Sequence, residues 1–123
     1  MNVSKYLSKE VVEYIKNTIS EANGNEVFFT GKIDASGIVY EVFAASRGTD
    51  NTVPVNYSHT IECSVLIHNH PNGVLSPSNA DLSVASNCSY NAKGFYIVNN
   101  DVSDIYVVVE PIKPQIIKKI DKD

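Results

Sequence analysis

Two histidines separated by one residue stand at the end of a short apolar run, and this feature constrains the fold more than any other. The run, residues 65–67, is Val-Leu-Ile, and Pro-Asn-Gly follows the second histidine at residues 71–73. An apolar, β-branched run bounded by turn residues predicts a buried strand. Because side chains alternate across a strand, His68 and His70 point to the same face near its C-terminal end.

A helix is predicted to begin shortly after this turn. Ser76 fits a helix N-cap and Pro77 the first helical position, and the helix continues from Asp81 to about residue 92. Ser78 and Asp81 are three residues apart in the first turn, so they share one helical face. Two imidazoles at a strand end and a carboxylate at a helix start can therefore converge on one point. This arrangement predicts a zinc site with three protein ligands and a fourth position left for water.

Each of these residues also has a purely structural explanation. Histidines on strands are commonly hydrogen-bonded without any metal. Asp81 can compensate the dipole of a helix N-terminus, and Ser78 can cap free backbone N–H groups there. The combination of all four residues in this register favours a site, because the separate explanations would otherwise have to coincide.

The rest of the chain predicts one sheet covered by helices. Residues from Ser4 or Ser8 to Ala22 have the apolar spacing of a helix, which Asn23-Gly24 ends. Strands are expected at residues 26–33, 38–45, 95–98 and 104–109, an edge or connector at 53–56, a short helical turn within 57–64, and a terminal helix at 114–120. This order predicts an α/β domain with a single mixed β-sheet flanked by helices. Six aromatic residues at strand spacing are expected in the core: Phe28, Phe29, Tyr40, Phe43, Phe95 and Tyr96.

Composition narrows the class of protein. The chain has 123 residues, enough for one domain with its own core. A net charge of -4 and scattered lysines disfavour direct nucleic-acid binding. Two cysteines are too few for a disulfide framework, and no stretch resembles a signal peptide or reaches membrane-spanning length. A cytoplasmic protein without membrane contact is therefore expected.

The motif His68-x-His70-x7-Ser78-x2-Asp81 resembles the JAMM motif of the MPN (JAB-type) zinc metalloproteases. The longer string, with His-Asn-His-Pro, a glycine and Pro-Ser, is most similar to the RadC-like prokaryotic branch. The resemblance implies the MPN/JAB fold, a sandwich like that of cytidine deaminases, in which both histidines and the aspartate hold Zn²⁺. It also implies that Ser78 stabilises the tetrahedral intermediate of amide hydrolysis, and that a glutamate from an earlier strand acts on the water.

Three glutamates precede the motif and could supply that carboxylate. Glu26 opens a predicted strand and is followed by Phe-Thr-Gly at residues 29–31, similar to the first strand of the family. Glu41 lies in the middle of a strand, and Glu62 lies before the histidine strand, far from its catalytic end. Glu26 is the preferred candidate for the catalytic base, and Glu41 remains the alternative.

Other zinc chemistry fits the sequence less well. A closed structural site would need Cys63 and Cys88 beside the histidines. Odd positions on the histidine strand face away from His68, and Cys88 lies two helical turns beyond Asp81, about 10 Å along the axis. The two cysteines are expected to be small buried hydrophobic residues. A zinc deaminase would need a Pro-Cys-x-x-Cys ligand pair, which the sequence lacks.

Two hypotheses for the function remain. The first is a zinc-dependent peptidase or isopeptidase, for which the resemblance suggests a peptide substrate such as the C-terminal tail of a ubiquitin-like or sulfur-carrier protein. The second is a RadC-like non-catalytic or accessory module of a larger DNA-processing or repair protein. The chain ends in Lys-Lys-Ile-Asp-Lys-Asp without an obvious finish, so a domain excised from a longer chain with further domains is expected.

Overall fold

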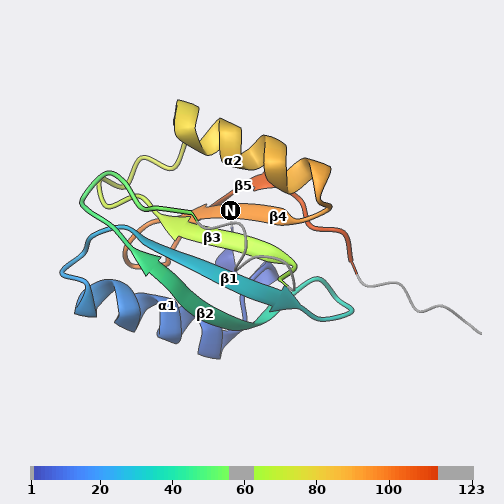
Figure 1. The fold of residues 1–123 in the computed structure, drawn as a ribbon. Helices are drawn as coiled ribbons and strands as arrows, with labels where there is room; N and C mark the ends of the chain where they lie inside the picture. The colour runs from blue at the N-terminus through green and yellow to red at the C-terminus, as the bar shows by residue number, and fades with distance from the viewer. Residues whose placement is uncertain (1, 56–62, 114–123) are drawn as a thin grey trace, which may run out of the picture.

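The computed structural model describes residues 2–55 and 63–113, which form one mixed β-sheet with a helix on each face (Figure 1). The strands follow the order β2-β1-β3-β4-β5. Strands β3 and β4 are parallel and are connected through α2, whereas the other neighbours are antiparallel. The elements are the 3-10 helix η1 (Val3–Lys5), helices α1 (Lys9–Glu21) and α2 (Asn79–Tyr90), and strands β1 (Val27–Ile33), β2 (Val39–Arg47), β3 (Val65–Asn69), β4 (Gly94–Val98) and β5 (Ile105–Val109). The predicted α/β class with a single mixed sheet is confirmed.

Helix α1 begins at the second of its two predicted start points. The side chain of Ser8 accepts a hydrogen bond from the backbone N–H of Val11 at 3.2 Å, which makes Ser8 the N-cap. The helix ends before Asn23 and Gly24, which have φ angles of 58° and 78°. This left-handed backbone cannot continue a helix and is well suited to glycine.

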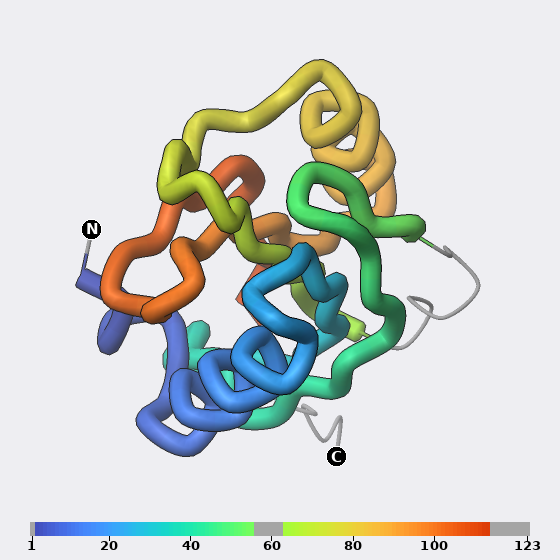
Figure 2. Tube along the Cα trace, turned by 90° about the vertical axis from the view of Figure 1, so that its left-hand side faces the viewer, coloured from blue at the N-terminus to red at the C-terminus, as the bar shows by residue number. Residues whose placement is uncertain are grey.

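The two helices cover opposite faces of the sheet, as the view in Figure 2 shows. Side chains from β1, β3 and β4 pack against α1 in one buried cluster, which includes Phe29, Ile67 and Tyr96. The neighbouring positions Phe28 and Phe95 belong to a second cluster on the α2 side. Because side chains alternate, each central strand supplies both cores, and the even-numbered face of β3 is the one turned toward α2.

Two of the six aromatic residues expected in the core are instead exposed. Tyr40 is 50% exposed and Phe43 is 57% exposed. Strand β2 lies at the sheet edge, and its register against β1 shifts between Lys32 and Ile33, so the simple alternation is interrupted. Helix α2 packs on β4 and β5 rather than on β2, so it does not cover Phe43. The other four aromatic residues are buried: Phe28, Phe29, Phe95 and Tyr96.

The prediction that Cys63 faces away from the histidine side was wrong. Cys63 is half-buried and packs against the cluster on the α2 side, which contains Leu66 and the buried Cys88. Strand β3 begins only at Val65, so its alternation of side chains does not extend back to residue 63. The expectation of a small buried hydrophobic residue is confirmed for Cys88, whereas Cys63 packs against the same cluster but is only half-buried.

Several expected features lie at or beyond the limits of the described chain. Residues 53–55 are a connector without strand pairing. Glu62, most of the expected turn at 57–64, and the expected helix at 114–120 lie outside the described residues. Within the described parts of the chain, no helix has both the length and the apolar character needed to cross a membrane.

Candidate metal centre

The end of β3 brings the two histidines to one side of the sheet. His68 is buried in the strand, and His70 follows directly after it; their ring centroids are 4.9 Å apart. The backbone N–H of His70 donates to the carbonyl of Val98 at 2.9 Å, so residue 70 stays beside β4. A turn then closes with a hydrogen bond from Gly73 N–H to the His70 carbonyl at 3.0 Å. Gly73 has a φ of 79°, a conformation that glycine adopts readily.

Helix α2 begins two residues later than predicted. Its N-cap is Ser78, not Ser76, and Pro77 precedes the cap instead of occupying the first helical position. Ser78 Oγ accepts from the backbone N–H of Asp81 at 3.1 Å, and Asp81 Oδ2 accepts from the N–H of Ser78 at 2.9 Å. This capping box satisfies two free N–H groups at once, which favours Ser78 as the cap. It also fixes the Asp81 carboxylate at the helix start.

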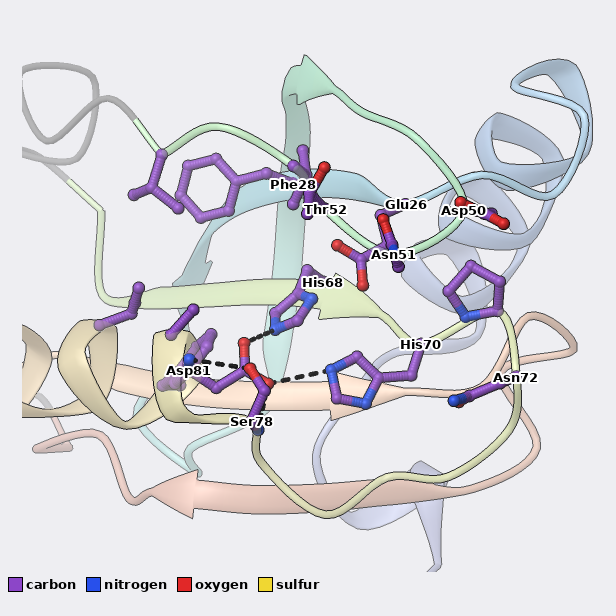
Figure 3. A pocket seen from close by; sticks show the side chains of 16 residues that line it. Glu26, Phe28, Asp50, Asn51, Thr52, His68, His70, Asn72, Ser78 and Asp81 are labelled. Carbon is purple, nitrogen blue, oxygen red and sulfur yellow. Dashed lines mark hydrogen bonds and ion pairs between the residues drawn. The ribbon is translucent and has the colours of Figure 1, made fainter.

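The Asp81 carboxylate connects the two imidazoles (Figure 3). Its Oδ1 lies 2.9 Å from Nε2 of His68, and its Oδ2 lies 3.0 Å from Nε2 of His70. Ligand atoms bound about 2.0–2.1 Å from a tetrahedral zinc ion are separated by roughly 3.3 Å, so these atoms are near the required spacing. Both ring nitrogens of His68 are buried, and neither has the geometry of a hydrogen bond. An imidazole in this state is available to a metal ion.

The tautomer of His70 likewise leaves a ring nitrogen available to a metal ion. Its Nδ1 lies 2.6 Å from the carbonyl oxygen of Val74, an acceptor, so this nitrogen carries the proton and donates. The lone pair of a neutral His70 is then on Nε2, facing a carboxylate oxygen of Asp81. His70 Nε2 and Asp81 Oδ2 are then two acceptors 3.0 Å apart, and they require a cation between them, either a proton or a metal ion. The donor set of two imidazoles and one carboxylate is one that zinc accepts.

Glu26 completes the cluster from the other side. It immediately precedes β1, its side chain is buried, and it approaches the histidines from β1 while Asp81 approaches from α2 (Figure 3). One ligand atom each from Glu26, His68 and His70 lie within 4.8 Å of one another. Glu41 is paired with Lys32 in the sheet, six positions along β1 from Glu26 and so roughly 20 Å away. Of the two described candidates, the structure therefore places only Glu26 beside the histidines.

Burial and neighbouring charges shift the acidity of these groups in different directions. Burial raises the pKa of the Glu26 carboxyl, more than the nearby imidazoles lower it. Burial alone would also raise the pKa of Asp81, but contacts with His68 and His70 and the N–H of Ser78 hold it well below its usual range. The hydrogen bond to Asp81 raises the pKa of His70. Glu26 therefore has a greater affinity for a proton than Asp81 has, although both are carboxylates.

A pocket of about 240 Å³ opens over the cluster. The loop after β2 forms one wall with Asp50, Asn51 and Thr52, and the apolar side chains of Phe28 and Phe95 lie toward the sheet. None of its described lining residues is a lysine or an arginine. Sequence reasoning did not find this wall, because its polar residues resemble any surface loop until the fold places them opposite the motif.

A family model for the RadC-like JAB domain matches residues 6–110. The chain belongs to this family. The match covers every strand of the sheet and both α-helices, so it also identifies the architecture as that of a RadC-like JAB domain. A search of curated proteins found no match. The RadC-like JAB domain thus carries a Glu/His/His group able to bind a metal, with the carboxylate of Asp81 in contact with both imidazoles.

Proposed function

We propose that this RadC-like JAB domain is a zinc-dependent hydrolase of amide bonds, a peptidase or isopeptidase of the JAMM type. His68, His70 and Asp81 would hold the zinc ion. The observation that carries the proposal is the position of Asp81, whose two carboxylate oxygens lie 2.9 and 3.0 Å from the two imidazoles. When bound, zinc would polarise the scissile carbonyl and lower the pKa of water toward neutrality.

Glu26 is the proposed general base. It is buried beside both histidines, and burial raises the pKa of its carboxyl. A raised pKa makes the carboxylate a stronger base toward water, and the same group can later deliver that proton to the leaving amine. Its position across the histidines from Asp81 leaves Asp81 free to act as a ligand (Figure 3).

Ser78 is proposed to stabilise the oxyanion. Its Oγ already accepts from the N–H of Asp81, so the direction of its lone pair is fixed. The hydroxyl hydrogen remains available for donation, and Ser78 lines the pocket. A donor aimed at the developing oxyanion contributes about 3–4 kcal/mol in comparable sites.

The pocket favours a neutral or cationic substrate. Its described lining includes the carboxylates Glu26, Asp50 and Asp81 and no cationic side chain other than the histidines. Phosphate groups would be repelled, which supports a peptide and not a nucleic acid as the partner. Within that class we propose an extended C-terminal tail, such as that of a ubiquitin-like or sulfur-carrier protein, because β2 offers a sheet edge next to β1.

The test combines metal analysis with a peptide-cleavage screen on three proteins. The wild type is expected to bind one zinc per chain and to cleave a peptide. Glu26→Gln should keep the zinc and lose hydrolysis, and His68→Ala should lose the zinc. Wild-type turnover by Glu26→Gln would remove that glutamate from the reaction. Zinc-free wild-type protein, prepared without chelators and with zinc supplied, would favour the accessory-module hypothesis.

A further inference from the structure

A buried asparagine stands between the two histidines and points to the other face of the sheet. Asn69 is 0% exposed, and its neighbour in the sheet, Val98, belongs to the core on the α1 side. Its Oδ1 accepts from the backbone N–H of Val27 at 2.8 Å, and its Nδ2 donates to the carbonyl of Asn25 at 3.1 Å. The amide of Asn69 therefore holds the chain immediately before and immediately after Glu26.

This amide replaces the backbone ladder where β1 and β3 separate. The ladder between these strands ends at the pair of Phe28 and His68. Beyond it, the backbone N–H of His70 bonds to Val98 of β4 instead. A side-chain amide has one acceptor and one donor group, so Asn69 offers β1 the same pair of hydrogen bonds that another strand residue would offer. The start of β1 is thereby held against the end of β3.

A second asparagine supports the first. Asn69 Nδ2 also donates to Oδ1 of Asn100 at 2.7 Å, and Nδ2 of Asn100 donates to the carbonyl of Gly24 at 3.1 Å. Asn100 lies in the turn between β4 and β5, and Gly24 lies in the turn after α1. Two amides thus join three segments that are distant in sequence, and all of these bonds converge on the backbone that leads to Glu26.

We propose that Asn69, supported by Asn100, is a positioning residue that places the Glu26 carboxylate against the histidines. Glu26 has two further backbone hydrogen bonds, from its N–H to the carbonyl of Thr49 at 2.7 Å and to its carbonyl from the N–H of Gly48 at 2.8 Å. These bonds hold Glu26 to the loop after β2, whereas Asn69 bonds the residues on either side of Glu26 to the histidine strand, one position beyond the last ladder pair, Phe28 and His68. The consequence for turnover rests on the proposed function; the positioning itself does not.

The first test needs neither metal nor substrate. In Asn69→Ala, the amide of Val27 loses its acceptor, and its hydrogen exchange measured by NMR is expected to become about tenfold faster relative to the amide of Phe29. The matched control is Asn99→Ala. Asn99 lies in the β4–β5 turn beside Asn100, and its Oδ1 accepts from the backbone N–H groups of Ser103 and Asp104. The control should leave the relative exchange of Val27 unchanged. Equal acceleration in both variants, or none in Asn69→Ala, overturns the proposal.

The second test separates positioning from general damage. Asn69→Ala keeps all three proposed zinc ligands, so zinc content should be unchanged while kcat falls about tenfold or more. In a Glu26→Gln background the same change should not lower the residual kcat of that variant any further, because both substitutions act through one carboxylate. A further fall of equal size in that background, or loss of zinc, contradicts the proposal. If the wild type shows no hydrolysis, the proposed function fails and the exchange result alone decides the role of Asn69.

A milder variant covers the case in which Asn69→Ala does not fold. Asn100→Ala leaves the bond between Asn69 and Val27 in place and removes only its support. A smaller acceleration of Val27 exchange is expected, in the same direction. An exchange rate equal to that of the wild type in Asn100→Ala would count against the network.

Discussion

Replacing Asp81 by asparagine should destabilise the metal-free protein measurably. The carboxylate uses both oxygens: Oδ1 contacts His68, and Oδ2 contacts His70 and the N–H of Ser78. Asparagine carries no charge, so the hydrogen bonds of this buried side chain with His70 and with the N–H of Ser78 lose their charge assistance, which lowers the free energy of unfolding by about 2 kcal/mol. The entropy of unfolding of a 123-residue domain is about 0.26 kcal/mol/K, so Tm should fall by about 8 °C.

The assay is thermal unfolding followed by circular dichroism in the presence of a chelator, with Asp34→Asn as the matched control. Asp34 caps the turn after β1 through one oxygen only, since Oδ1 accepts from both Ser36 and Ile38. An asparagine carbonyl can make the same two bonds, so the control should unfold within about 2 °C of the wild type. A Tm for Asp81→Asn as close to the wild type as that of the control would refute the reasoning. Added zinc should raise the Tm of the wild type and much less that of Asp81→Asn.

Three further outcomes follow from the packing. Burial raises the pKa of the Cys88 thiol to about 11, so at pH 8 this thiol should react with a disulfide reagent only after the protein is unfolded. Gly94→Ala would place a Cβ 2.8 Å from Pro111 Cδ, so the free energy of unfolding measured in urea is expected to fall by about 1–3 kcal/mol. Phe43→Ser should change stability by about 0.5 kcal/mol or less, because the ring is exposed; a large loss would contradict its assigned place at the sheet edge.

Local sequence patterns predicted most of the site. The apolar run before His68, the turn after His70 and the acidic residue at a helix start each depend on neighbours within a few positions. The position of the helix cap was missed although its signal was present. Ser78 has an acidic residue three positions later and Ser76 does not, and this spacing is what allows a reciprocal capping box.

The features that sequence did not predict depend on contacts between distant segments. Asn69 bonds to residues 42 and 44 positions earlier, and nothing in the local pattern distinguishes it from any polar residue between two histidines. The exposure of Tyr40 follows from the register shift between β1 and β2, which depends on the pairing and not on the composition of β2. The pocket wall formed by the loop after β2 is likewise visible only once the fold is known.

Equilibrium dialysis against zinc followed by elemental analysis tests most directly whether His68 of β3, His70 just after it and Asp81 of α2 hold one metal ion. The account predicts one zinc per chain for the wild type and for Glu26→Gln, and a loss of bound zinc in both His68→Ala and Asp81→Ala. Undiminished zinc in either of those two ligand variants, with the fold intact by circular dichroism, would contradict it.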